Sequence, residues 1–229
     1  MLVVVGSCSL KALFDEQVIE ANNGAEKYEV SGKLTIPEYQ RPYIWRFAEV
    51  KRLIDDLICY FYKPRQQAYY LGSIIIHEID DKLNIIDGQQ RITTLAILCH
   101  LLDLDTQPNM TYTAPASQQR IAEIINQLQS QYSEQLDKLK ENFNLDQLNT
   151  TLVVTLSEDD AYRFFETQNT GGIRLSGQDI IKAHHLRATP EHFQNNYAKQ
   201  WESMGDFKLL IDAILQVRHW QFYIYSACR

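Results

Sequence analysis

The feature that most constrains the fold is a short apolar strand, 84–86, that leads directly into a strongly apolar helix. Ile92, Leu95 and Cys99 repeat at helical spacing and the opposite side is also apolar, which predicts a buried helix from Ile92 to about Leu104. The first turn is polar instead, with two amides, a guanidinium and two hydroxyls. Because an unpaired buried polar group costs about 2 kcal/mol, these groups must find partners or line a cleft.

Two interpretations of this polar turn remain open. In the first, Asp87 caps the helix and pairs with Arg91. In the second, an anion binds to Arg91, to the Thr93 and Thr94 hydroxyls and to the free N–H groups of the turn. A helix N-terminus normally disfavours a cation, and a bound anion would reverse that penalty. Gly88 would let the backbone approach such a ligand closely, so the turn is a candidate phosphate site.

Three stretches of the chain resemble one protein family. The segment 87–95, Asp-Gly-Gln-Gln-Arg-Ile-Thr-Thr-Leu, resembles the signature of the N-terminal domain of GmrSD-type restriction systems, which is related to ParB and sulfiredoxin. The segment 36–45 resembles the first motif of that family, and the segment 165–176, with Asp179 and Lys182, resembles its third. The resemblance spans roughly Leu34 to Ala188, and the three motifs occur in the family's order. One position departs from the pattern, since Thr170 stands where such domains often carry Arg.

The resemblance implies a fold class as well as an activity. We expect an α+β protein: a small ParB/sulfiredoxin-like sheet with packed helices, followed by a mainly helical C-terminal half. Residues 1–105 would form the nucleotide-binding α/β region. Residues 118–229 would form a helical region that completes the same site within a single compact unit.

The resemblance also implies roles for individual residues. Asp87, Gln90 and Arg91 would be catalytic: Arg91 would hold phosphate, and Asp87 would position Mg²⁺ or water. Gln89 and Gln90 would orient the nucleotide, and the expected ligands are a nucleoside triphosphate and Mg²⁺. The residues expected to bind the nucleotide or its phosphates are Gln40, Arg41, Gly88, Gln89, Thr93, Thr94, Asn169, Gly171 and Lys182.

We further expect the three motifs to converge on one cleft. Gln40 and Arg41 lie between two prolines on a stiff loop, and Asn169 lies where a predicted helix ends. A triphosphate carries several negative charges, and neither Arg41 nor Arg91 alone offsets them in a partly desolvated site. Two guanidiniums, helix N–H groups and a bound Mg²⁺ could do so together.

Charge and cysteine content narrow the function classes. The formal charge is −7, which excludes a basic module that coats nucleic acid, so any DNA contact would use a local patch or a partner. The four cysteines form no CxxC pair, and Cys59 and Cys99 are expected in helix cores, which favours a reducing cytoplasm. No apolar run is long enough to span a membrane, and residues 1–8 suggest a lipoprotein signal only faintly.

The remaining pattern predicts mostly helices around one hairpin. We expect Phe193, Tyr197 and Trp201 to belong to a core and not to a base-stacking platform. In chain order the expected elements are a helix at 9–20, an extended segment at 27–36, a helix at 47–63, a strand at 70–79 with a turn at Asp80-Asp81, a flexible connection at 106–117, a helix at 121–139 and a last helix at 207–225.

Three function classes remain open. The first is a nucleotide-hydrolysing sensor module of a modified-DNA restriction or anti-phage system. The second is a nucleotide-switched module that binds DNA or a partner without turnover, and the third is a catalytically degenerate scaffold. A nuclease pattern is missing from the sequence, so the expected partner is a nuclease domain or subunit, in cis or in trans.

Overall fold

The computed structural model describes residues 3–63, 67–106, 108, 110–157, 159–161, 163–164 and 177–204. The chain divides into two compact units. The large unit comprises Met1–Pro37 and Pro42–Gln168, and the small unit comprises Glu38–Arg41 and Asn169–Arg229. Each unit is described by itself.

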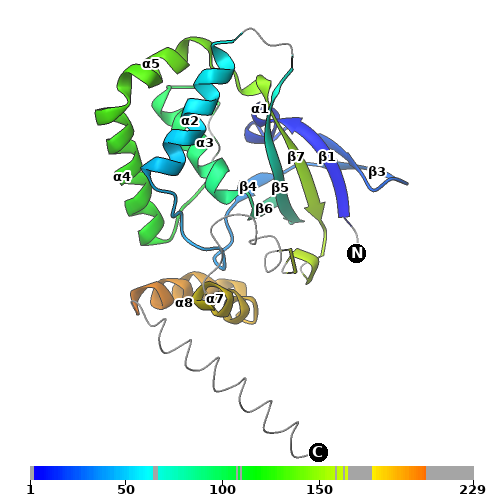
Figure 1. The fold of residues 1–229 in the computed structure, drawn as a ribbon. Helices are drawn as coiled ribbons and strands as arrows, with labels where there is room; N and C mark the ends of the chain where they lie inside the picture. The colour runs from blue at the N-terminus through cyan, green and yellow to red at the C-terminus, as the bar shows by residue number, and fades with distance from the viewer. Residues whose placement is uncertain are drawn as a thin grey trace, which may run out of the picture. The chain divides into compact units, whose positions relative to one another are not determined.

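The large unit is built on a mixed sheet of seven strands, in the order β3-β2-β1-β7-β5-β6-β4 (Figure 1). Its two central strands, β7 and β5, run parallel, as do β6 and β4, and the other neighbours are antiparallel. Together with its helices the sheet confirms the expected α+β class. The strands are β1 (Val3–Ser9), β2 (Ile19–Asn22), β3 (Lys27–Val30), β4 (Lys33–Thr35), β5 (Tyr69–Ile79), β6 (Lys82–Asp87) and β7 (Leu148–Thr155).

The predicted hairpin is confirmed, and the geometry of its turn explains how two aspartates can form it. β5 and β6 pair antiparallel, with Ile79 opposite Lys82. Asp80 and Asp81 both have positive φ, 48° and 58°, as the turn of a two-residue hairpin requires. Aspartate tolerates this left-handed region better than most residues, which makes Asp-Asp a workable turn.

The predicted helix at 9–20 is wrong except for its first third. Ser9 caps a five-residue helix, α1 (Leu10–Phe14), by accepting a hydrogen bond from the Ala12 amide at 3.1 Å. The chain then leaves the helix through Glu16, which has a φ of 57°, and enters β2. The N-terminal stretch that faintly suggested a signal is β1, which pairs with β7 from Val3 to Ser9.

Helices of the large unit gather on one side of the sheet (Figure 1). They are α2 (Phe47–Phe61), α3 (Gln89–Leu101), α4 (Pro115–Gln131) and α5 (Ser133–Asn142), and a short 3₁₀ turn spans Leu145–Gln147. The single helix expected over 121–139 is wrong, because the chain breaks between α4 and α5 at Tyr132, with φ −137° and ψ 17°. The Tyr132 hydroxyl bonds to Asp55, and its ring meets Phe47 edge-on at 6.2 Å, so tertiary contacts favour the break.

The core of the large unit joins the helices to the sheet. Cys99 is buried, as predicted, and burial raises the pKa of its thiol to about 12. The prediction for Cys59 is wrong, because that side chain is exposed on α2.

The irregular connection before α4 ends at Ala114, three residues earlier than expected. None of the helices in the described part of the chain is long and apolar enough to cross a membrane.

The described part of the small unit contains two helices, α7 (Gly177–Arg187) and α8 (Glu191–Ser203). The expectation that the α8 aromatics form a core is wrong for two of the three, because Phe193 and Tyr197 are 47% and 48% exposed. Trp201 is half-buried. The helix predicted at 207–225 lies outside the described residues.

Candidate functional site

The candidate site begins where β6 ends and α3 begins. Gly88 is the N-cap of α3 and has a φ of +94°, a conformation that a side chain would strain, so the helix starts at Gln89 and not at Ile92. The Ile92 amide donates to the Gly88 carbonyl at 3.0 Å. The backbone N–H groups of Gln89, Gln90 and Arg91 precede this bond and have no partner within the described residues. They form the positive end of a helix that is buried along most of its length.

Arg91 projects from this turn onto the neighbouring strand β5. Its Nη1 donates to the Leu71 carbonyl, and its Nη2 donates to the Ser73 carbonyl at 2.6 Å. A guanidinium has five N–H groups, so three remain without a partner in the part of the chain that the structure describes. The alternative in which Arg91 pairs with Asp87 is wrong, because no ion pair joins these two described residues. Asp87 is half-buried and its carboxylate has no partner within the described residues.

Gly72 shapes β5 around the Arg91 guanidinium. Its φ is +92°, and the register between β5 and β7 shifts between Tyr70 and Ser73. A Cβ atom at position 72 would lie 2.5 Å from Arg91 Nη1, so any side chain there would displace the guanidinium from its present position. Thr150 on β7 fixes the bulge by donating its hydroxyl to the Gly72 carbonyl at 2.7 Å. The bulge thus presents two strand carbonyls to one arginine side chain.

Gln90 holds the last part of the first motif, residues 42–45. Its Oε1 accepts from the backbone amides of Ile44 and Trp45, at 2.9 Å and 3.2 Å. Its Nε2 donates to the Pro42 carbonyl at 3.2 Å. These bonds use the amide at both ends, so the geometry gives Gln90 a positioning role for residues 42–45.

The two threonine hydroxyls of the turn are paired with tyrosines. Thr94 Oγ1 bonds to the Gln90 carbonyl at 2.9 Å and shares a hydrogen bond of 2.8 Å with the Tyr43 hydroxyl. Thr93 Oγ1 accepts from the Tyr112 hydroxyl at 2.9 Å. Burial raises the pKa of Tyr43 above its ordinary value, and it raises the pKa of Tyr112 to about 12. The two threonines are fully buried, so they brace α3 from the protein side.

Gln89 differs from these paired neighbours. Its side chain is 5% exposed, and its Oε1 is buried without any hydrogen-bond partner among the described residues. An unsatisfied buried carbonyl oxygen costs about 1–3 kcal/mol, so its persistence calls for a reason. A ligand that brings a donor or a cation would supply the missing partner.

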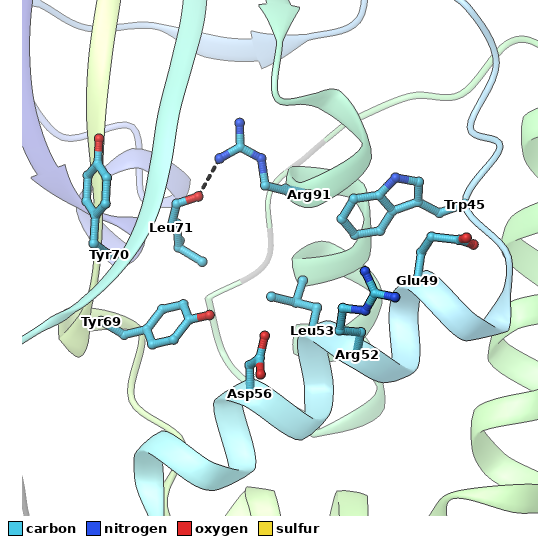
Figure 2. A pocket seen from close by; sticks show the side chains of 9 residues that line it. All are labelled: Trp45, Glu49, Arg52, Leu53, Asp56, Tyr69, Tyr70, Leu71 and Arg91. Atoms are coloured by element: carbon cyan, nitrogen blue, oxygen red, sulfur yellow. Dashed lines mark hydrogen bonds between the residues drawn. The ribbon is translucent and has the colours of Figure 1, made fainter. Parts of the chain in front are cut away.

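A pocket of about 250 Å³ opens beside Arg91, between α2 and the start of β5 (Figure 2). Most of the charged and aromatic residues that line it were not selected as candidate site residues from the sequence. Arg52 and Asp56 occupy polar positions of an amphipathic helix, where the pattern cannot separate a pocket from open surface. The lining residues are Trp45, Glu49, Arg52, Leu53, Asp56, Tyr69, Tyr70, Leu71 and Arg91.

The structure thus brings the middle motif together with part of the first in the large unit. Gln40 and Arg41 belong to the small unit, and Gln40 is buried. Lys182 is also in the small unit, where its ammonium pairs with Glu202 at 3.0 Å between α7 and α8. Asn169 and Gly171 lie outside the described residues, so the convergence of the three motifs stays a prediction.

The unpaired oxygen atoms at the turn from β6 to α3 suit a metal ion that binds together with a ligand. The described residues contain no group of three or more His, Cys, Asp or Glu side chains placed to hold a metal ion. Mg²⁺ is commonly held by one or two carboxylates together with substrate phosphates, and it prefers oxygen ligands. The unpaired Asp87 carboxylate and the unpaired Gln89 Oε1 are such oxygens. Mg²⁺ bound through a triphosphate therefore fits these residues.

Comparison with known proteins gives one family match. The family model of the GmrSD restriction endonuclease, N-terminal domain, matches residues 20–186, which run from β2 to the end of α7. The match covers every residue of the candidate site and all three motifs. Comparison with curated proteins finds no match.

Proposed function

Because the chain belongs to the family of GmrSD restriction endonuclease N-terminal domains, we propose that it is the nucleotide-sensing module of a restriction or anti-phage defence system. In this role it binds a nucleoside triphosphate with Mg²⁺ at the turn from β6 to α3 and hydrolyses it. The match to the N-terminal domain of a restriction endonuclease supports a restriction-related role and a nuclease partner.

One observation carries the nucleotide proposal, namely the cluster of unpaired polar groups at the first turn of α3. Three backbone N–H groups and three guanidinium N–H groups of Arg91 are without partners in the described part of the chain. These are donors of the kind that hold phosphate oxygens at helix N-termini. The turn also contains the unsatisfied Gln89 oxygen, which a triphosphate with its hydrated Mg²⁺ would satisfy.

The proposed roles follow from the hydrogen-bonding state of each group. Arg91 and the free N–H groups would bind the phosphates, and Asp87 would hold Mg²⁺ or orient the attacking water. Gln89 Oε1 would accept a hydrogen bond from the bound ligand. Gln90 contributes by fixing the loop 42–45, which lies against the pocket through Trp45. Hydrolysis at this turn would then be reported to the nuclease partner.

A second candidate is supported by a specific observation. Gln90, Thr93 and Thr94 are all occupied by contacts within the protein, which is also compatible with a nucleotide-switched module without turnover. Phosphate release measured with purified protein, triphosphate and Mg²⁺ separates the two candidates. Turnover that disappears in Asp87→Asn supports the hydrolase, and binding without any turnover supports the nucleotide-switched module.

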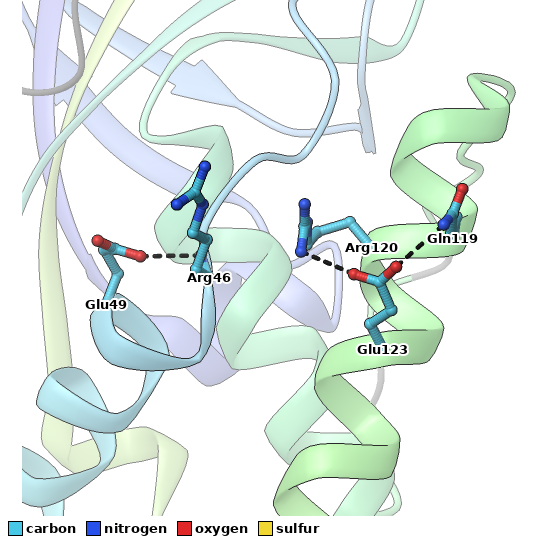
Figure 3. Close-up of polar contacts among 5 residues, drawn as sticks. All are labelled: Arg46, Glu49, Gln119, Arg120 and Glu123. Atoms are coloured by element: carbon cyan, nitrogen blue, oxygen red, sulfur yellow. Dashed lines mark hydrogen bonds and ion pairs between the residues drawn. The ribbon is translucent and has the colours of Figure 1, made fainter.

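The binding test compares two arginines by calorimetric titration of a triphosphate with Mg²⁺. Arg91→Lys keeps the positive charge but loses the forked donors, and we expect its affinity to fall at least about tenfold. Lysine is preferred to alanine here because it can still donate to one of the β5 carbonyls that Arg91 holds. The control is Arg120→Lys, because Arg120 pairs with Glu123 on α4 at 2.7 Å (Figure 3) and, among the described residues, donates no hydrogen bond to residues 87–91. Equal affinity in both folded variants would contradict the proposal.

We also propose that the chain does not cut DNA without its nuclease partner. Its net charge of −7 disfavours sequence-independent binding to DNA, and the matched family is the N-terminal domain of a restriction endonuclease. Purified protein incubated with Mg²⁺, triphosphate and either plain DNA or DNA with modified bases should leave both substrates intact. Cleavage that persists through purification and disappears in a variant of this chain would contradict the proposal.

A further inference from the structure

Two neighbouring charge pairs on α2 behave differently, although their spacing is the same. Lys51 and Asp55 are four residues apart and form an ion pair at 2.5 Å, which Tyr132 joins through its hydroxyl. Arg52 and Asp56 are also four residues apart, yet neither has a hydrogen bond or an ion pair within the described residues. Opposite charges at this spacing usually attract one another on a helix surface. Arg52 and Asp56 are both exposed, so their hydrogen-bonding groups face solvent and are accessible to a ligand.

Both unpaired side chains line the pocket beside Arg91. Figure 2 shows Arg52 and Asp56 projecting from α2 toward the space below Arg91, with Trp45 on one side and Tyr69 on the other. Burial raises the pKa of the Tyr69 phenol, and the negative charge of Asp56 adds to the effect. Tyr69 therefore lies close enough to Asp56 to be affected by its charge, while the Asp56 side chain itself is exposed to solvent.

The size and lining of the pocket limit what it can hold. A space of about 250 Å³ is below the range of drug-sized pockets, which suits a single planar ring system. Trp45 and Tyr69 supply aromatic faces, and base–aromatic stacking is a general mode of nucleobase binding. Leu53 and Leu71 supply apolar contact, so the walls fit a flat heteroaromatic ligand.

We propose that this pocket binds the base of the triphosphate and that it selects guanine. This inference rests on the proposed function, because the pocket is continuous with Arg91, which holds the phosphates in that proposal. It goes beyond that function by assigning a base and four residues, Trp45, Arg52, Asp56 and Tyr69, that the phosphate site does not include.

The hydrogen-bonding groups of guanine match the two unpaired charges. The Asp56 carboxylate only accepts, and guanine offers two adjacent donors, N1–H and the 2-amino group. The Arg52 guanidinium only donates, and guanine offers the acceptors O6 and N7, which arginine contacts in base recognition. Adenine presents an acceptor at N1, which would face the carboxylate without a proton between them. Uracil has a single ring N–H and lacks an amino group.

The test is calorimetric titration of the full chain with GTP, ITP, ATP and UTP in the presence of Mg²⁺. ITP lacks only the 2-amino group, so we expect it to bind roughly tenfold more weakly than GTP, with ATP and UTP weaker still. Asp56→Asn should remove the preference for GTP over ITP, because an amide offers only one acceptor oxygen. The matched control is Asp55→Asn on the same helix, which should keep the preference. Thermal unfolding of both variants checks that they are folded.

The outcomes separate this inference from the proposed function. Equal binding of all four triphosphates, lost together in Arg91→Lys, overturns the guanine pocket and leaves the phosphate site supported. A GTP preference that Asp56→Asn leaves intact also overturns the pocket assignment. Absence of binding for all four overturns both proposals. A GTP preference that disappears in Asp56→Asn but not in Asp55→Asn supports the pocket.

Discussion

Gln89 and Gln90 are adjacent, buried and chemically identical, yet the protein uses them in opposite ways. The Gln90 amide bonds to three backbone groups of the loop 42–45, whereas the Gln89 carbonyl oxygen has no partner within the described residues. The same division extends through the first turn of α3. We call Gln90, Thr93 and Thr94 the anchoring residues, and Asp87, Gln89 and Arg91 the unpaired residues, since each of these keeps unused polar groups.

This division shows how a polar turn can be both a structural joint and a candidate binding site. The anchoring residues fix the position of the turn against the loop and against Tyr43 and Tyr112. A site that is held rigidly loses less conformational entropy when it binds a ligand, which favours the unpaired residues as ligand contacts. Substitutions in the two sets should therefore affect different measurements.

The largest effect on stability is expected from Gln90→Met. Methionine matches the length of glutamine but cannot hydrogen-bond to the amides of Ile44 and Trp45 or to the Pro42 carbonyl. Three backbone groups would lose their partner, so the free energy of unfolding should fall by about 3 kcal/mol. Urea denaturation measures this loss. A fall below about 0.5 kcal/mol would mean that water replaces the amide easily and that Gln90 is not an anchor.

A smaller loss of stability, with a loss of binding, is expected from Gly72→Ala. The new methyl group would lie 2.5 Å from Arg91 Nη1, and alanine would also be strained at a φ of +92°. We therefore expect the free energy of unfolding to fall by about 2 kcal/mol. Displacement of Arg91 should also weaken triphosphate binding. The matched control is Gly24→Ala, because Gly24 has a φ of +90° and open space where the methyl group would be added. Equal losses in the two variants would show that backbone strain alone accounts for the effect.

The smallest effect is expected from Tyr112→Phe, and it depends on pH. Removing the hydroxyl that donates to Thr93 should cost about 1 kcal/mol at pH 8. The pKa of Tyr112 is about 12 in the folded protein against a reference of 10.0, so its contribution is fully present below pH 10 and is lost as pH rises toward 12. The difference in unfolding free energy between wild type and variant should therefore shrink above pH 10. A difference that stays constant to pH 12 would contradict the burial that raises the pKa of this hydroxyl.

The periodicity of apolar residues was sufficient to predict the helices and strands around the site. It was not sufficient to separate the anchoring residues from the unpaired residues. The apolar stripes of α2, α3 and β5 are long, so their existence follows from sequence pattern. The strands β1 and β2 could not be predicted in the same way, because β2 is short and β1 gains stability from pairing with β7, which is distant in sequence. The break at Tyr132 depends on contacts with α2 that no local pattern contains.

Site residues were predictable by type and position, but not by partner. The motif 87–91 pointed to the correct turn, and Gly88 has the left-handed conformation that a close backbone turn requires. Nothing in the sequence distinguishes Gln89 from Gln90, because their difference arises from which one faces the loop 42–45. Arg52 and Asp56 could not be selected either, because they have the same spacing in the sequence as Lys51 and Asp55. Only the structure shows that Lys51 and Asp55 bond to each other and that Arg52 and Asp56 do not.

The most direct test of the central claim is the affinity of Gln89→Met for a triphosphate with Mg²⁺, measured by calorimetry. The variant removes an unsatisfied buried oxygen, so the protein should be as stable as wild type or slightly more stable. If the unpaired residues form a binding site, its affinity for the triphosphate should fall at least about tenfold while the fold is retained. A stable Gln89→Met protein that binds the triphosphate as tightly as wild type would contradict the account.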